Sequence, residues 1–187
     1  TAEKLSAGEI LQMEKSMTRS MTEEVYFDMI NQKTASLIAT SCELGAITTT
    51  KNKEDRRATF SFGENLGMAF QIKDDLFDLL GKEVDTGKNI GGDVKKNMLT
   101  LPLIFVKNNM SRIQYSELRK LLNKKRKSNS VIAKICDMVQ EAGGIDYAKQ
   151  KLDYYSGMAK EAISLYPESI IKKSLLDLVE FNIQRVK

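Results

Sequence analysis

The sequence predicts an all-α protein. Only 2 of its 187 residues are proline, so few positions would interrupt a helix. Runs in which Val, Ile or Thr alternate with polar residues are scarce, and such alternation is the mark of a half-buried strand. Residues 52–80, by contrast, form one long amphipathic stretch with an apolar face suited to a core. We expect residues 1–187 to form a single domain, because this length is enough for a sizeable core.

Capping residues and helix breakers predict the first three helices. The first is expected over residues 3–20. The second is expected over residues 23–44, with Gly45 at the position just after its end, where glycine is common. Asn52 is expected to cap the third helix, residues 53–80, because its side chain can accept a hydrogen bond from the first turn. At 1.5 Å per residue this third helix would be about 42 Å long.

The second half of the chain begins with an expected loop over residues 81–97, in which four glycines stand among charged residues. Long loops in compact domains are usually functional. Pro102 suits the first turn of the next helix, where its missing N–H costs nothing. Further helices are expected over residues 111–127, 130–142, 145–166 and 168–185.

Composition excludes several classes of protein. The chain is 42% apolar and 29% charged, which is typical of an ordered domain rather than a disordered one. Its net charge of +4 is mild and acids are interspersed with bases, so nucleic acid is not an expected partner. No apolar run approaches the ~18 residues of a membrane span. Cys42 and Cys136 lack motif spacing, and with no apparent signal peptide they favour the cytoplasm.

The most informative segment is the acidic end of the long predicted helix. Gln71, Asp74 and Asp78 follow one another at spacings of three and four, so they share one helical face, with Asp75 beside them. Stacked carboxylates repel each other unless a cation lies between them. The chain has no histidine, and all-oxygen ligands suit a hard cation such as Mg²⁺, which leaves room for substrate phosphates. The segment therefore predicts a carboxylate–Mg²⁺–diphosphate site; the alternative is a solvated acidic helix end.

Gly63 and Gly67 extend the same face toward the start of the helix. Glycines at these positions leave room either for another backbone or for a ligand tail. Lys33 lies in an apolar stripe of the preceding helix, where an ammonium is costly unless it meets an anion or reaches the surface. Contact with a phosphate and snorkelling to solvent both remain open for this lysine, and Thr34 beside it could add a hydroxyl.

The predicted loop carries a second candidate cation, Lys88, among glycines whose N–H groups could fold over an anion; an ordinary turn is the alternative. A basic run, residues 124–127, is expected to end the helix over 111–127 and to complement its dipole. A weak contact with a membrane surface is the second interpretation of that run.

Taken together, these motifs resemble the trans-isoprenyl diphosphate synthases, specifically the C-terminal half of a long-chain polyprenyl synthase of the octaprenyl diphosphate synthase kind. Gly8-Glu9 with Gln12 resembles the family's GExxQ element, and residues 67–78 resemble its second aspartate-rich motif with the GxxxQ before it. The other matching segments are Lys33-Thr34, residues 87–93 with Thr100-Leu101-Pro102, Gly143-Gly144 and the tail around Arg185.

The resemblance implies an isoprenoid-synthase helical bundle, here its C-terminal portion, and a prenyltransferase that joins isopentenyl diphosphate to an allylic prenyl diphosphate. It implies that Mg²⁺ is bound by Asp74, Asp75 and Asp78, the last two mainly through water. Lys33 and Lys88 would bind diphosphate. The carbonyl of Lys33, with Thr34 and Gln71, would line the site of the allylic cation beside Asp74. A homodimer is also implied.

Two departures from the family pattern matter. The family's first aspartate-rich motif would precede Thr1, so we expect the chain to be a fragment that is nearly inactive alone. Met98 stands where the family usually has a lysine, which removes one expected diphosphate contact. The alternative function is therefore a non-catalytic partner subunit of a prenyl synthase. A plain helical interaction domain and a class I terpene cyclase are further alternatives.

Overall fold

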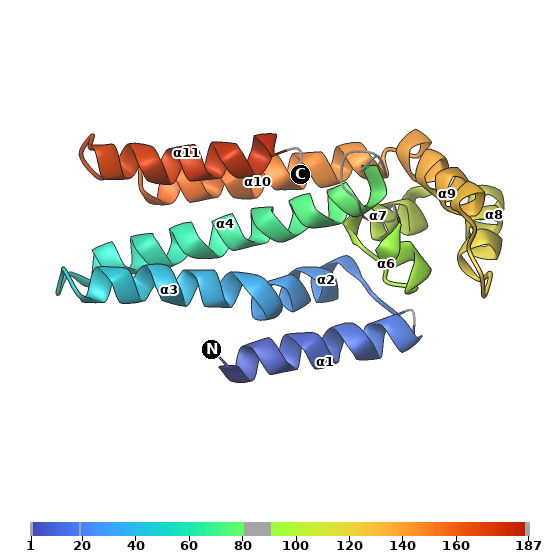
Figure 1. Cartoon of the computed structure of the whole chain (residues 1–187), viewed down its shortest axis with the longest axis horizontal. Coiled ribbons are helices and arrows are strands. Elements are labelled where there is room, and N and C mark those ends of the chain that lie inside the picture. The colour runs from blue at the N-terminus through green and yellow to red at the C-terminus, as the bar shows by residue number, and fades with distance from the viewer. Residues whose placement is uncertain (1, 19, 81–90, 186–187) are drawn as a thin grey trace. The chain divides into compact units, whose positions relative to one another are not determined.

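The computed structural model describes residues 2–18, 20–80 and 91–185, and every regular element in these ranges is helical, which confirms the predicted fold class (Figure 1). No helix within them is both long and apolar enough to cross a bilayer. The elements are α1 (Ala2–Thr18), α2 (Glu23–Ile30), η1 (Asn31–Ala35), α3 (Ser36–Ile47), α4 (Lys53–Leu80), α6 (Gly92–Lys95), α7 (Leu101–Asn109), α8 (Arg112–Leu122), α9 (Asn129–Glu141), α10 (Gly144–Ala162) and α11 (Ile170–Gln184).

The helices divide into two compact units. The first unit holds residues 2–11, 27–73 and 151–185, and the second holds residues 12–18, 20–26, 74–80 and 91–150. Four helices, α1, α2, α4 and α10, are shared between the units. The division therefore falls inside continuous helices rather than at a linker, and the expectation of one domain over residues 1–187 stays a prediction.

In the first unit, α3, α10 and α11 run alongside the larger part of α4 (Figure 1). The centre of their packing is a buried apolar cluster of Phe62 and Leu66 from α4, Ala159 and Ile163 at the end of α10, and Val179 from α11. Fully burying a Phe, Leu or Ile side chain stabilises a fold by roughly 1.5–3 kcal/mol, so this cluster is a main anchor of α4. Phe62 and Leu66 of the predicted apolar face pack here, whereas Leu80 at the end of that face is 43% exposed.

In the second unit, α7 is buried along most of its length and packs against α9, which in turn pairs with α8 (Figure 1). Helix α9 presents Ile132, Ile135 and Val139 to the core, at the three- and four-residue spacing of one helical face. Gly144 begins α10 so close to α7 that a Cβ there would lie 2.6 Å from the carbonyl oxygen of Pro102. Only glycine permits that contact.

Several predicted boundaries are confirmed. The side chain of Asn52 accepts a hydrogen bond from the N–H of Glu54 at 2.9 Å, and α4 then runs to Leu80 as expected. Pro102 lies in the first turn of α7. Ser111 caps α8 in a reciprocal capping box with Gln114, which explains why a helix starts directly after it.

Other boundaries are wrong in instructive ways. The single helix expected over residues 23–44 is divided into α2, the π-helical segment η1 and α3, and α3 continues through Gly45 to Ile47. Helix α8 ends at Leu122, so the basic run at 124–127 follows the helix rather than forming its last turn. The last helix begins at Ile170 rather than at residue 168, because Ser169 caps it. In the loop expected over 81–97, residues 92–95 form a short helix.

Candidate active site

Helix α4 carries both the glycine positions and the acidic segment. Its glycines face a neighbouring backbone: a Cβ on Gly63 would lie 2.8 Å from the Cα of Ala39, and one on Gly67 would lie 2.5 Å from the Cα of Ala35. Real Cβ atoms essentially never approach a neighbour this closely. The first of the two interpretations of these glycines, room for another backbone, is therefore the one the structure has.

The segment held against Gly67 is η1, and it contains Lys33 and Thr34. A π-helical segment has one more residue per turn than its flanking α-helix, and such segments are frequent at functional sites. The hydroxyl of Thr34 donates a hydrogen bond to the side-chain oxygen of Gln71 at 3.0 Å, and both residues are half-buried. Two predicted site residues that are 37 positions apart in the sequence thus contact each other directly.

Lys33 forms an ion pair with Glu9 of α1, with 3.1 Å between the ammonium nitrogen and a carboxylate oxygen. The lysine side chain is 29% exposed, so it is neither buried nor fully solvated. Helix α1 comes this close because Gly8 lies against the backbone of Lys33, where a Cβ would be 2.7 Å from the lysine nitrogen. Lys33 therefore has a carboxylate partner and a direction fixed by α1.

Asp75 is buried, with 6% of its surface exposed. One of its carboxylate oxygens accepts a hydrogen bond from the hydroxyl of Tyr26, a fully buried residue of α2, at 2.7 Å. A buried carboxylate is costly unless it is hydrogen-bonded, and a phenol is a strong donor. Asp75 therefore ties α4 to α2, and any action on a bound cation would be indirect.

Asp78 organises the turn that follows residue 90. A carboxylate oxygen of Asp78 accepts a hydrogen bond from the N–H of Asp93 at 3.0 Å, while its carbonyl oxygen accepts one from the N–H of Gly91 at 2.8 Å. Gly91 has a φ of 69°, a left-handed conformation that favours glycine. Burial raises the pKa of the Asp78 carboxyl, although the N–H groups of Asp93 and Gly92 and the nearby Lys96 and Lys95 act in the opposite direction.

Asp74 is half-buried and lies one turn after Gln71 and one turn before Asp78 on α4. Its carboxylate and that of Asp78 are hard oxygen ligands of the kind Mg²⁺ binds. Among the residues that the structure describes, no three Asp, Glu, Cys or His side chains converge as a complete metal site. Because Mg²⁺ is usually held by one or two carboxylates plus substrate phosphates, the donor set fits one side of such a site.

Lys88 lies outside the described residues, so its place relative to the site stays a prediction.

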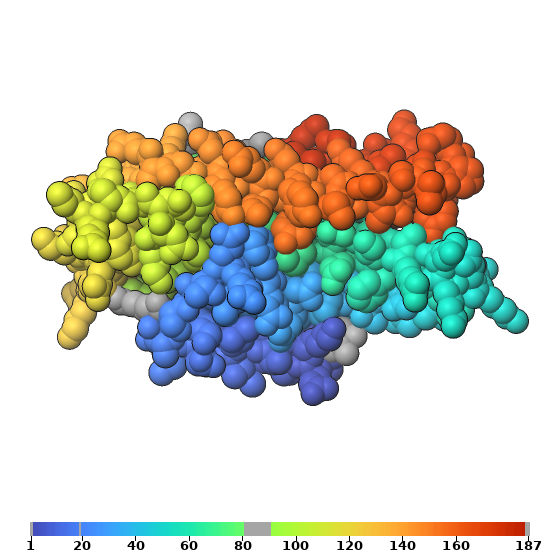
Figure 2. Space-filling view, turned by 180° about the vertical axis from the view of Figure 1, so that it is seen from behind, coloured from blue at the N-terminus to red at the C-terminus, as the bar shows by residue number. Residues whose placement is uncertain are grey.

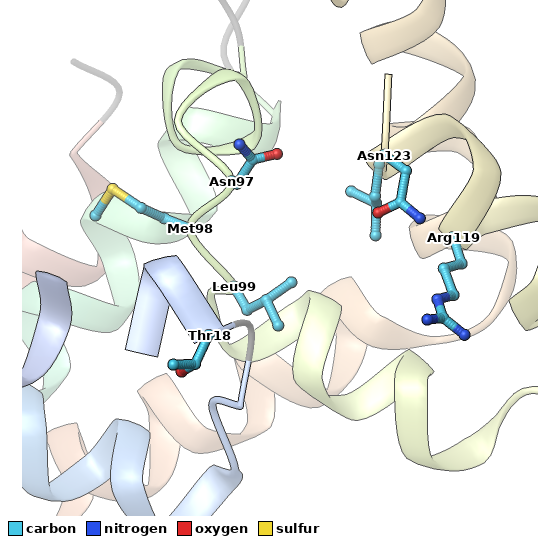
Figure 3. Close-up of a pocket in the computed structure, with 7 residues that line it drawn as sticks. Thr18, Asn97, Met98, Leu99, Arg119 and Asn123 are labelled. Atoms are coloured by element: carbon cyan, nitrogen blue, oxygen red, sulfur yellow. The ribbon is translucent and has the colours of Figure 1, made fainter. Parts of the chain in front are cut away.

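Met98, which replaces the expected lysine, is half-buried, and its N–H donates to the carbonyl oxygen of Asp93 at 2.8 Å. A pocket of about 320 Å³ that was not predicted from the sequence lies beside Met98. It is lined by Thr18, Asn97, Met98, Leu99, Arg119, Leu122 and Asn123. In Figure 3, Met98 and Leu99 point to opposite sides of the segment that holds them, and Arg119 and Asn123 lie across from Leu99.

Sequence reasoning missed three contacts of the predicted site residues: Glu9 on Lys33, Tyr26 on Asp75, and Asp93 on Asp78. Two of these contacts had a partial signal in the sequence. Glu9 belongs to a matched motif, and Tyr26 lies in the same apolar stripe as Lys33. The pairing itself depends on which helices meet, which one-dimensional spacing does not specify.

The described site is a long helix with an acidic end and, held against its middle, a π-helical segment whose Thr34 hydroxyl contacts Gln71. The sequence model of the Polyprenyl synthetase family matches residues 1–139. The chain therefore belongs to the polyprenyl synthetase family, and the resemblance noted in its motifs is confirmed.

Similar proteins agree with this assignment. The all-trans-nonaprenyl-diphosphate synthase (geranyl-diphosphate specific) of Rhodobacter capsulatus is 30% identical over 98% of the chain. The crystal structure of geranylgeranyl pyrophosphate synthetase from Pyrococcus horikoshii Ot3 matches with a TM-score of 0.90 at 31% identity over 98% of the chain, and covers 55% of that protein. The polyprenyl synthase of Caulobacter crescentus CB15, crystallised with calcium and isoprenyl diphosphate, matches with a TM-score of 0.89 at 27% identity, over 98% of this chain and 56% of that one. The chain spans 55% of the length of the Rhodobacter relative.

Proposed function

We propose that the protein is a Mg²⁺-dependent prenyltransferase that condenses isopentenyl diphosphate with an allylic diphosphate to make a polyprenyl diphosphate. The observation that carries the proposal is the contact between Thr34 and Gln71 one helical turn before Asp74 on α4. The names of the relatives, nonaprenyl-diphosphate and geranylgeranyl pyrophosphate synthases, support this class of reaction. The calcium and isoprenyl diphosphate of the Caulobacter protein support a divalent cation beside a diphosphate.

The proposed reaction breaks the C–O bond of the allylic diphosphate, and the bonding electrons leave with the diphosphate. The double bond of isopentenyl diphosphate then attacks the allylic cation, a C–C bond forms, and a proton is lost. Lys33 and Lys88 would neutralise negative charge as it develops on the leaving group. The Glu9 carboxylate, paired with Lys33 in the absence of substrate, would hold the ammonium in position until a diphosphate replaces it.

Thr34 and Gln71 have a different proposed role. The Thr34 hydroxyl donates its proton to the side-chain oxygen of Gln71, so the Thr34 oxygen presents lone pairs rather than a proton to the site. Oriented dipoles of this kind stabilise a carbocation without reacting with it. Water must also be excluded, because it would quench the cation.

Asp74 would hold Mg²⁺, with Asp78 and Asp75 acting mainly through water and through the contacts that orient the end of α4. When bound, Mg²⁺ would supply positive charge to the diphosphate leaving group. Aspartates upstream of this chain, expected from the resemblance, would complete the metal site. Because its metal site would be incomplete, we expect the chain alone to turn over little. From the family resemblance we also expect the complete protein to be a homodimer, and we expect it to be cytoplasmic.

The test is prenyl transfer by protein made from the complete reading frame, with Mg²⁺, labelled isopentenyl diphosphate and farnesyl diphosphate, and the products sized by chromatography. Asp74→Ala should abolish turnover, whereas Asp177→Ala, which removes an exposed aspartate of α11, should not. A near-normal kcat for Asp74→Ala at saturating Mg²⁺ would contradict the assignment of Asp74.

One observation favours a second function, a non-catalytic partner subunit of a prenyl synthase. Met98 removes an expected diphosphate contact next to the turn that Asp78 organises. If the folded complete protein makes no product alone but restores activity to an inactive partner chain, the subunit function replaces the enzyme. A discrete long product from the protein alone would exclude it.

A further inference from the structure

Helices α10 and α11 each carry one buried polar side chain in the first unit, to which residues 151–162 of α10 and all of α11 belong. Ser156 of α10 is 1% exposed and Asn182 of α11 is 4% exposed. Within the described part of the chain, the Ser156 hydroxyl and the amide oxygen and nitrogen of Asn182 have no hydrogen-bond partner. Buried polar atoms in native proteins are nearly always hydrogen-bonded, often to ordered water, so these three atoms need an explanation.

Neither side chain uses the bond that its own helix offers. A serine or asparagine within a helix can donate to the carbonyl oxygen four residues earlier. Ser174 of α11 does so at 2.9 Å and Asn109 of α7 does so at 2.8 Å, both at exposed positions. Ser156 and Asn182 form no such bond within the described residues. Their polar atoms therefore remain available to a group outside their own helices.

The two helices pack against each other in opposite directions. Only residues 163–169 connect them, and Figure 1 and Figure 2 both show the orange α10 next to the red α11. The ammonium of Lys160 donates to the carboxylate of Glu180 across the pair. The residue before each of these, Ala159 and Val179, is fully buried and belongs to one apolar cluster. The contact between the helices therefore passes through Ala159 and Val179.

Ser156 and Asn182 lie one turn further along this contact. Ser156 comes three residues before Ala159, and Asn182 comes three residues after Val179. Residues three apart share a helical face, and in an antiparallel pair these two steps lead in the same direction. Three polar atoms are thereby buried at one level of an otherwise apolar contact.

The end of α11 at this level is also tied to α4. The ammonium of Lys73 donates to the carbonyl oxygen of Ile183, the residue after Asn182, at 2.6 Å. Lys73 lies two turns after Leu66 on the face of α4 that packs in the first unit. A cation is favoured at the carbonyl end of a helix. Polar groups from α4, α10 and α11 therefore gather where α11 ends.

We propose that an internal water molecule binds at this level and bridges Ser156 and Asn182. Buried water typically forms about three hydrogen bonds to polar groups that the protein leaves unpaired. The hydroxyl of Ser156 can donate or accept, and the amide of Asn182 offers an acceptor and two donors, so either side of the amide can complete the bridge. Neither side chain carries a charge, so a neutral ligand as small as water suits them.

A bridging water at this position would fix the register of α10 and α11. A slide of the helices by one turn would set Ser156 and Asn182 against apolar side chains, where unpaired polar atoms are costly. The register in turn places the end of α11 that Lys73 holds, one residue before Asp74 on α4. Neither the water nor the register requires prenyl transfer, so a protein without that activity would hold the same site.

The test combines a high-resolution crystal structure of the complete protein with urea denaturation of Ser156→Ala, Asn182→Leu and the double variant. The structure should contain a water within hydrogen-bonding distance of both side chains. Each single variant should lower the urea midpoint, because it leaves polar atoms of the other residue buried without a complete set of bonds. The double variant should lower the midpoint by clearly less than the sum of the two, because the water leaves with its last partner.

The matched control is the same set of variants at Ser174 and Asn109, Ser174→Ala and Asn109→Leu, whose midpoint shifts should add. A direct hydrogen bond between Ser156 and Asn182, bonds from both to their own helices, or a dry contact would overturn the proposal, as would additive midpoints. If Asn182→Leu does not fold, the structure of Ser156→Ala decides. The water should be lost or displaced in that variant, and a water that stays unchanged would contradict the bridge.

Discussion

Gly67 provides the sharpest test of how α4 positions the residues of η1. Replacing it by alanine places a Cβ 2.5 Å from the Cα of Ala35 and 2.9 Å from its Cβ. The first distance falls about 0.9 Å short of ordinary van der Waals contact, which begins near 3.4 Å. Since the obstacle is backbone rather than the end of a flexible side chain, α4 and η1 must separate or the π-helical segment must shift.

The magnitude is the balance of two effects. Alanine is favoured over glycine inside a helix by about 0.8–1 kcal/mol, which would stabilise the variant. Overpacking a tight contact costs about 1–3 kcal/mol, and more when backbone must move. We expect Gly67→Ala to be destabilised by about 1–2 kcal/mol overall. Gly157→Ala isolates the first effect, because Gly157 lies within α10 with nothing within 4 Å of a Cβ.

The assay is urea denaturation followed by circular dichroism, with the midpoints of the three proteins compared. Gly157→Ala should move the midpoint to higher urea and Gly67→Ala to lower urea, so that the two alanines differ by about 2–3 kcal/mol. If Gly67→Ala matches Gly157→Ala, the helices are not in the close contact described and the argument fails.

Three further predictions concern the acidic end of α4 and its surroundings. Tyr26→Phe leaves the buried Asp75 carboxylate without its phenol donor and should cost about 1–3 kcal/mol of unfolding free energy, whereas Tyr154→Phe at an exposed position should cost little. Because burial raises the pKa of Asp78, the stability that its proton contributes is present below the ordinary pKa and is lost as the pH rises through the folded-state value. Thermal unfolding against pH should therefore show a decline in the wild type as the pH rises above the ordinary range of a carboxyl group, and Asp78→Asn should lack that decline; parallel profiles would contradict this. Met98→Lys should keep or raise prenyl transfer in the complete protein, and a large loss would mean that Met98 has a role of its own.

The predicted helices were correct where a local signal marks a helix end. The cap that Asn52 forms and the start at Pro102 both lie within the first turn of their own helix, so the neighbouring sequence contains the signal for each helix start. Gly45 misled because a glycine ends a helix only when the chain turns into the left-handed region after it. Helix α3 instead continues to Ile47, because nothing at Gly45 forces that turn.

The candidate site was predicted as a set of residues but not as a set of contacts. The spacing of Gln71 and Asp74 follows from helical geometry, and that part could be predicted. The bond between Thr34 and Gln71 depends on the close approach at Gly67, which involves two helices distant in sequence. The π-helical segment gave no periodic signal at all, because an extra residue within one turn disturbs too short a stretch to be recognised.

The extra residue of η1 has a consequence for how the gene can change length. A π-helical turn covers about the same rotation as an α-helical turn with one residue more, so deleting one residue within Asn31–Ala35 would restore an ordinary turn while α2 and α3 keep nearly their present orientation. Met29 and Ile30, now 5% and 1% exposed, would stay in their buried positions. The same deletion within α3 would rotate everything before it by about 100°. In-frame single-codon deletions should therefore be tolerated better by the fold at η1 than in the α-helices on either side.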